Sequence, residues 1–167
     1  MDFANNAFYD KGISKAREGM SMIRPYEIQK DVVIYRYYDS TRAGSPQGGT
    51  HGPWWIEFEY FQQIKHFAAR NGHAHSYAAR LFAAILYEWS EVDAFVACRV
   101  RVPLKAWKGR GKQVEQDSDP AKRDARDLPR MTPMQGVLEI YQLCIPGLGG
   151  SQSISASALE IVSDGAL

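Results

Sequence analysis

Two polar side chains occupy apolar strand faces, where a buried polar group needs a partner. Arg36 shares its predicted strand face with Ile34 and Tyr38, and Gln142 lies beside Cys144 in a later apolar strand. A buried guanidinium is costly unless an anion or several hydrogen-bond acceptors meet it. Arg36 therefore indicates a site for an anionic ligand such as a pyrophosphate, and Gln142 is a second candidate site residue. The alternative is structural: Arg36 pairs with an internal carboxylate, and Gln142 binds a neighbouring backbone group.

Aromatic side chains close to Arg36 in the sequence could hold the flat ring of such a ligand. Trp54 and Trp55 follow a polar, glycine-rich loop, and Tyr38 ends the predicted strand that carries the arginine. Aromatic faces stack on rings at little cost, so these three residues are candidates for ligand binding. Their alternative is a place in the core or against the sheet.

Hydrophobic periodicity predicts the elements that must position these residues. Apolar residues alternate or run continuously in four predicted strands, and they recur every three or four residues in three predicted helices. The predicted strands are residues 31–38, 92–102, 137–145 and 158–162, and the predicted helices are residues 5–21, 57–70 and 76–89. Because two helices cluster between the first and middle strands instead of alternating with each strand, the order predicts an α+β fold.

A long charged segment, residues 108–135, separates the second and third predicted strands. It contains scattered glycine and proline and almost no large apolar residue. A structureless segment of this length is unusual in a compact domain. We therefore expect a mobile or disordered loop within a single domain that spans residues 1–167.

The composition predicts a folded domain and narrows its partners. Hydrophobic residues make up 45% of the 167 residues, charged residues make up 23%, and the formal net charge is +1. Such a charge does not draw the whole domain onto nucleic acid or an anionic membrane. No stretch is apolar enough for a membrane span or a signal peptide. We expect a cytoplasmic protein, or one exported without a classical signal peptide, with Cys98 and Cys144 as buried thiols.

Common catalytic motifs are missing from the sequence, which contains no glycine-rich phosphate loop, G-x-S-x-G or H-E-x-x-H. His73 and His75 lie in a predicted turn, where exposed histidines outnumber metal ligands, so no metal site is expected. The basic run 105–112 contains Trp107, a pattern that single-strand nucleic-acid binders use. In a nearly neutral domain such a run is more often a solvated loop.

Three short segments occur in an order typical of one enzyme family. Arg36 lies in the first core strand, a segment from Thr50 to Trp55 leads into a helix, and a final strand over residues 139–147 ends in a Pro-Gly turn. In this order the chain resembles the Arg-Ser-Glu class of mono-ADP-ribosyltransferases. The resemblance implies an ADP-ribosyltransferase-like fold with a split, mostly antiparallel central sheet. It also implies NAD as the substrate, bound by Arg36, Tyr38, Thr50, Trp54 and Trp55.

The position of the family's catalytic glutamate is occupied by Gln142, which carries no charge to stabilise a cationic sugar. The nearest acid, Glu139, lies three residues earlier and on the opposite strand face. Either Glu139 substitutes for the missing acid, or Glu57 or Glu59 contributes, or the transferase reaction is lost.

Together these features predict a bacterial toxin or effector that transfers ADP-ribose from NAD to a macromolecular acceptor, expected to be a protein, or that hydrolyses NAD. Whether the chain is an active enzyme is left open. One alternative is a non-enzymatic protein-interaction module in which Arg36 makes a structural ion pair. Another is a single-stranded nucleic-acid binder that uses residues 105–112.

Overall fold

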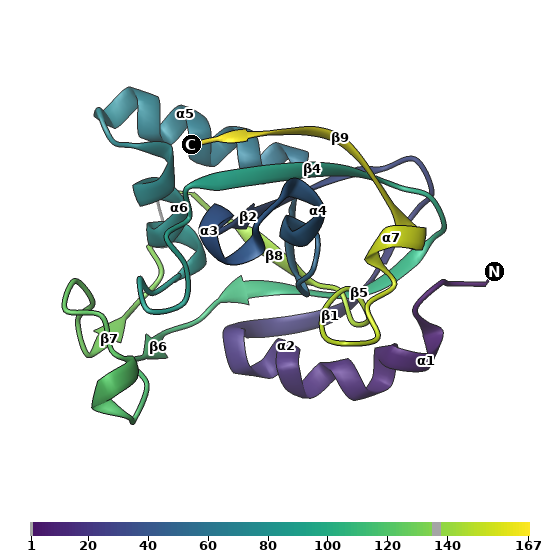
Figure 1. The fold of residues 1–167 in the computed structure, drawn as a ribbon, viewed down its shortest axis with the longest axis horizontal. Coiled ribbons are helices and arrows are strands. Elements are labelled where there is room, and N and C mark those ends of the chain that lie inside the picture. Colours follow the sequence, from purple (N-terminus) through teal and green to yellow (C-terminus); the bar gives the residue numbers. More distant parts are fainter. Residues whose placement is uncertain (1, 135–137) are drawn as a thin grey trace.

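The computed structural model describes residues 2–134 and 138–167 and shows a mixed α+β fold around a large antiparallel sheet (Figure 1). Its strand order is β1-β5-β8-β3-β2-β4-β9, and all neighbouring strands are antiparallel. The strands are β1 (Met20–Ile28), β2 (Val33–Tyr38), β3 (Trp54–Glu57), β4 (Ala94–Val100), β5 (Leu104–Gly111), β8 (Tyr141–Cys144) and β9 (Leu159–Ala166). The predicted α+β class with a large antiparallel sheet is confirmed.

The helices lie in three groups around this sheet (Figure 1). The chain begins with α1 (Asn6–Tyr9), η1 (Asp10–Gly12) and α2 (Ile13–Gly19), which run beside β1. The longest helix, α5 (Phe58–Asn71), packs against α6 (His75–Ala83) and the sheet. Three single-turn helices, α3 (Ser40–Ala43), α4 (Pro46–Gly49) and α7 (Ser155–Ala158), lie near β2, β4 and β9.

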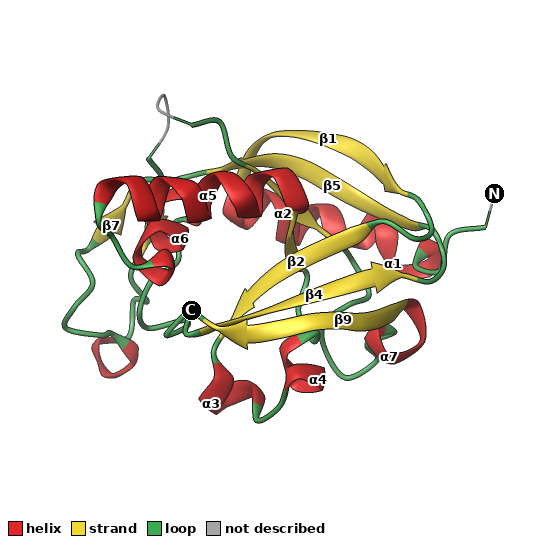
Figure 2. Ribbon diagram, turned by 90° about the horizontal axis from the view of Figure 1, so that it is seen from above, coloured by secondary structure: helices red, strands yellow, loops and turns green. Residues whose placement is uncertain are grey.

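The sheet is split at β3, which is only four residues long. Trp54 and Trp55 pair with β8, whereas Ile56 and Glu57 pair with β2. We call β1, β5 and β8 the first half-sheet, and β2, β4 and β9 the second half-sheet. Figure 2 shows β1 and β5 as one group of strands and β2, β4 and β9 as another. The two half-sheets are therefore joined through a strand that gives each of them two residues.

Side-chain periodicity explains the elements that were predicted correctly. In α5, Tyr60, Phe61, Ile64 and Ala68 are buried at the spacing of one helical face, and the helix ends at Gly72 in the left-handed region. In β4 the alternate residues from Ala94 to Val100 are buried in the larger core cluster. Val102, the last residue of the strand predicted over residues 92–102, lies beyond the end of β4 and is exposed.

Several elements differ from the prediction. β1, β3 and β5 were not predicted, and the helix expected over residues 76–89 is α6, which ends at Ala83. The helix stops because Ala84 adopts a left-handed φ of 52°. β1 escapes detection because it is an edge strand with exposed charges and Pro25, which an edge tolerates.

The segment predicted as a structureless loop, residues 108–135, contains strands and a short helix in its described part. Its first four residues belong to β5, and the following part contains β6 (Val114–Glu115), η2 (Pro120–Lys122) and β7 (Arg130–Met131). β6 and β7 form a separate two-stranded sheet. We call residues 113–134 the insert. Residue 135 lies outside the described residues, and the predicted mobility of the segment stays a prediction.

Cys98 and Cys144 are buried free thiols, as expected, and burial raises the pKa of each to about 12. Within the two described ranges, every helix is too short or too polar to cross a bilayer.

Candidate functional site

A cavity of about 930 Å³ lies where the two half-sheets separate. Its walls come from β2, β3 and β8 in the sheet, and from α2, α3 and the segments after α6 and β5. The sheet residues that line it include Arg36, Tyr38, Trp54, Trp55 and Gln142. Five of the seven residues predicted as site residues therefore meet in one place.

Strand register explains why Arg36 and Gln142 line this cavity. β2 pairs with β3 only through Ile34 and Tyr35, so Arg36 is the first residue beyond that pairing. β8 pairs with β3 only at Leu143 and Cys144, so Gln142 is the last residue before that pairing. At both positions β3 no longer pairs with the neighbouring strand. The side chains of Arg36 and Gln142 therefore line the space between the two half-sheets.

Arg36 has fewer partners than a buried guanidinium needs. Its Nη1 donates a hydrogen bond of 2.6 Å to the carbonyl of Gly49, and its buried Nε has no partner. Among the described residues it belongs to no ion pair. Burial lowers the pKa of Arg36 to about 10, because desolvation disfavours the charged form. The structural ion pair considered as an alternative is therefore not seen in the part of the chain that the structure describes.

Gly52 makes room for this guanidinium. A Cβ at Gly52 would overlap Nη2 and Cζ of Arg36. The preceding turn, α4, also depends on a small residue, since a Cβ at Gly49 would lie 2.9 Å from the ring of Tyr38. Neither glycine was predicted as part of the site, although both belong to the glycine-rich loop before Trp54.

Gln142 is 6% exposed, and its Nε2 donates a hydrogen bond of 3.3 Å to the carbonyl of Ala83. This contact is the backbone bond considered as its structural alternative. The same side chain lines the cavity, so its amide can also meet a ligand there.

The aromatic residues divide into core and cavity positions. Trp55 is fully buried, and its Nε1 donates to the carbonyl of Gly52, so it is mainly a core residue. Trp54 is half-buried and packs near Met20 and Cys144. Tyr38 is buried in the larger core cluster. Trp54 therefore offers the more accessible indole face to a ligand.

Two predicted site residues lie outside the cavity lining. Thr50 donates from its hydroxyl to the carbonyl of Gln47 at 2.7 Å, which closes a local turn. Glu139 is exposed and pairs with Arg110. Of the other acids considered, Glu59 is exposed and Glu57 is paired with Lys108, so none of the three stands beside Arg36.

The acids that do line the cavity have partners of their own. Glu18 pairs with Lys15 at 2.9 Å, and Glu115 pairs with Arg130 at 3.1 Å. The third, Asp39, accepts backbone hydrogen bonds from Arg42 and Glu91. The positive charge of Arg36 thus stays available to a ligand.

Of the two histidines predicted to lie in a turn, His73 lies between α5 and α6, whereas His75 is the first residue of α6. The hydroxyl of Tyr37 lies 2.8 Å from Nε2 of His75, and burial lowers the pKa of His75 to about 4. Across residues 2–134 and 138–167, no three metal-binding side chains gather into a possible site.

The basic run 105–112 is not the solvated loop that was expected, because most of it forms β5. Lys108 is buried, and Trp107 stacks on Tyr9 with ring centroids 4.5 Å apart. The run therefore does not present its lysines and tryptophan together as a surface for stacked bases.

Two solved structures have a similar backbone. "Rhs1-CT in complex with cognate immunity protein RhsI1" has a TM-score of 0.50 and 10% sequence identity, over 89% of this chain and 84% of that chain. "Structure of Tne2 in complex with Tni2" has a TM-score of 0.48 and 13% identity, over 87% of this chain and 92% of that chain. At these identities the first likeness concerns the fold alone, and the second is too weak to support an argument. No protein-family model and no curated protein matches the chain.

These comparisons correct the function predicted from the sequence. The prediction of an ADP-ribosyltransferase that transfers ADP-ribose from NAD to a macromolecular acceptor is wrong: the similar fold is that of a domain described in complex with its cognate immunity protein. The ADP-ribosyltransferase-like form of the sheet is likewise not confirmed. The site agrees with this correction, because Gln142 is neutral and Glu139 lies outside the cavity. What the chain shares with a solved structure is the fold of Rhs1-CT.

Proposed function

We propose that this chain is a toxin-type effector domain that binds a phosphate-bearing small molecule of the nucleotide class in the cavity between its half-sheets. The observation that carries the proposal is Arg36, a desolvated cation beside the cavity with one backbone hydrogen bond. A phosphate would supply the acceptors that this guanidinium lacks, in the bidentate geometry that arginine favours.

The remaining walls of the cavity fit the same class of ligand. Its volume of about 930 Å³ lies within the usual range for small-molecule sites. Trp54 offers an aromatic face for a ring, and Gln142 offers an amide for hydrogen bonding. NAD as the bound ligand stays a prediction from the sequence and is one compound to test.

The assignment as a toxin-type effector has separate support. The similar fold, Rhs1-CT, is described in complex with a cognate immunity protein, and an immunity protein implies a harmful activity to restrain. We therefore propose that a protein of the same role binds this chain and blocks its activity.

Isothermal titration tests the ligand class. The compounds are pyrophosphate, ADP, ATP and NAD, with adenosine as the uncharged control. We expect the phosphate compounds to bind and Arg36→Ala to weaken them about 100-fold, as expected when a buried charged partner is removed. The matched control is Arg99→Ala, because Arg99 is exposed and paired with Glu160 on the neighbouring strand. Equal binding by Arg36→Ala and wild type would contradict the proposal.

Growth of bacteria that express the chain tests the effector role. We expect wild type and Arg99→Ala to stop growth and Arg36→Ala to permit it, at equal amounts of folded protein. Normal growth with wild-type protein would rule out a toxin that acts in those cells.

A further inference from the structure

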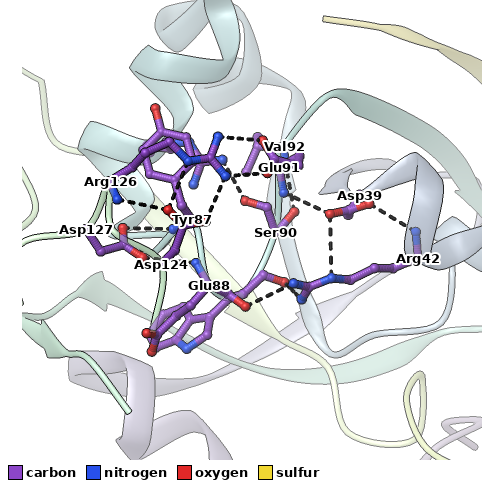
Figure 3. A network of polar contacts seen from close by, with 12 residues as sticks. Asp39, Arg42, Tyr87, Glu88, Ser90, Glu91, Val92, Asp124, Arg126 and Asp127 are labelled. Atoms are coloured by element: carbon purple, nitrogen blue, oxygen red, sulfur yellow. Dashed lines mark hydrogen bonds and ion pairs between the residues drawn. The ribbon is translucent and has the colours of Figure 1, made fainter. Parts of the chain in front are cut away.

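The segment between α6 and β4, residues 84–92, forms one wall of the cavity. Ala84, Ile85, Trp89 and Ser90 line the hollow. This segment has no regular helix or strand structure, and we call it the strap. Figure 3 shows the polar contacts that surround it. How the strap is held determines whether the cavity can open on this side.

On one side, the strap is held by residues that follow β2. Arg42 of α3 donates to the carbonyl of Trp89 and, at 3.0 Å, to that of Glu88. Asp39 accepts a hydrogen bond of 3.0 Å from the backbone N–H of Glu91. These contacts hold residues 88–91, the second half of the strap.

On the other side, the insert holds the strap through Asp127. Its two carboxylate oxygens accept hydrogen bonds of 2.9 Å from the backbone N–H groups of Tyr87 and Glu88. The ring of Tyr87 lies between two guanidinium groups, at 3.5 Å from that of Arg80 and 4.1 Å from that of Arg126. Arg126 also pairs with Glu91, and Arg80 of α6 donates to the carbonyls of Ile85 and Ser90. Charged side chains thus hold the strap, and no strand of the described residues pairs with it.

Both ends of the strap have unusual backbone conformations. Ala84 and Val92 each have a φ of 52°, in the left-handed region that residues with a Cβ rarely adopt. For the β-branched Val92 this conformation is strained. Ala84, Leu86 and Val92 are all buried, and this burial favours the closed position. A change of backbone angles at the two ends would relieve strain. The burial of Leu86 in the closed state keeps the population of the open state small.

We propose that the strap opens the cavity by moving as one unit about Ala84 and Val92, with Asp127 and Arg42 as two latches on opposite sides. The closed state then has both latches engaged, as in Figure 3. Release of either latch favours the same open state, so the two latches are thermodynamically coupled. A minor open state of this kind controls how fast a ligand enters the cavity.

Amide hydrogen exchange tests this coupling without any ligand. In Asp127→Ala, we expect the amide of Glu91, which is bound to Asp39, to exchange about 10-fold faster, together with those of Tyr87 and Glu88. In Arg42→Ala, the amides of Tyr87 and Glu88, which are bound to Asp127, should also exchange about 10-fold faster. The amides of β4 should be unchanged in both variants.

The control variant is Asp119→Ala, since Asp119 lies in the same insert and its carboxylate accepts from Ala121. It should leave exchange in the strap unchanged. Faster exchange confined to the amides that each latch itself contacts would overturn the proposal, because the strap would then not move as a unit.

The effect on ligand entry rests on the proposed function and has a separate readout. Asp127 does not line the cavity, so Asp127→Ala should speed both association and dissociation of inorganic pyrophosphate about 10-fold and leave Kd nearly unchanged. Unchanged rates in a variant with faster exchange would overturn the gating role. If pyrophosphate fails to bind the wild type, the proposed function fails, while the exchange result still decides whether the strap moves.

Discussion

Two buried cations, one in each half-sheet, have opposite surroundings. Lys108 of β5 is 5% exposed and forms an ion pair with Glu57 of β3. Arg36 of β2 lies beside the cavity with a single backbone acceptor and a buried Nε that has no partner. The difference shows that burial of a cation does not by itself mark a ligand site: the site is where the partners are incomplete.

The surroundings of Lys108 are complete. Its Nζ lies 4.5 Å from the ring centroid of Tyr26, 5.4 Å from that of Tyr60 and 5.7 Å from that of Tyr141. Tyr26 also donates to Glu57 at 2.9 Å, and burial together with this hydrogen bond raises the pKa of Tyr26 to about 12. Charge, hydrogen bonds and aromatic faces are all supplied within the protein, and no acceptor is left for a ligand to add.

Glu57→Ala is expected to have the largest effect, because it leaves Lys108 buried and unpaired. We expect the free energy of unfolding to fall by about 3 kcal/mol, as for other broken buried ion pairs. Urea denaturation measures this change. The double variant Glu57→Leu with Lys108→Met is the control and should recover most of the loss, since an apolar pair needs no partner. A loss below about 1 kcal/mol in the single variant would remove the contrast between the two cations.

Gly52→Ala should displace the guanidinium of Arg36 and reduce its hydrogen bonding. The added Cβ displaces the guanidinium and breaks its hydrogen bond to Gly49. We expect pyrophosphate binding to weaken about 10-fold, the value of one charged hydrogen bond. Calorimetric titration measures the affinity. Unchanged affinity would mean that the guanidinium need not occupy its observed position.

Arg36→Met should show that the arginine does not stabilise the fold. It replaces a desolvated, under-bonded cation with an apolar side chain of similar length. We expect the free energy of unfolding to stay constant or to rise by up to about 1 kcal/mol, while pyrophosphate binding is lost. A clear drop in stability would make Arg36 structural, as Lys108 is.

His75 adds a third kind of base to the comparison, one that is half-buried and stays neutral. Burial lowers its pKa from 6.5 to about 4, so the unfolded state takes up a proton first as the pH falls. Stability should therefore decrease between pH 6.5 and pH 4. His75→Gln, which can keep a hydrogen bond to Tyr37, should flatten this part of the stability profile measured by thermal unfolding. An unchanged slope would assign the pH dependence to other groups.

The sequence predicted those parts of the fold whose pattern is local. β2 and β4 are apolar and β-branched, and α5 repeats its apolar residues at helical spacing, so each could be read without its neighbours. β3 has four residues and β5 carries an inward-facing lysine, so their strand character depends on partners far away in the chain. The end of α6 depends on a left-handed φ at Ala84 that the residue type does not signal.

The same limit applies to the site. Arg36 was identified because a cation in an apolar strand is visible in the sequence, and Gln142 was identified by the same logic. Trp54 was identified as an aromatic side chain close to Arg36 in the sequence. The role of Glu139 rested on the order of short motifs and stays a prediction, whereas its side chain is paired with Arg110 outside the cavity lining. The strap could not be predicted, since its contacts join three separate segments.

The short strand β3 has a consequence for how the protein is made. Its partners are residues 33–38, which precede it closely, and residues 141–144, which are synthesised almost ninety residues later. Pairings between such distant segments form slowly, because a long loop must close before any contact rewards it. A growing chain can therefore pair β2 with β3 and β4 early, but it acquires the cavity only when Cys144 has emerged and docked beside Trp54. Until then, the nascent protein has no place to hold a ligand.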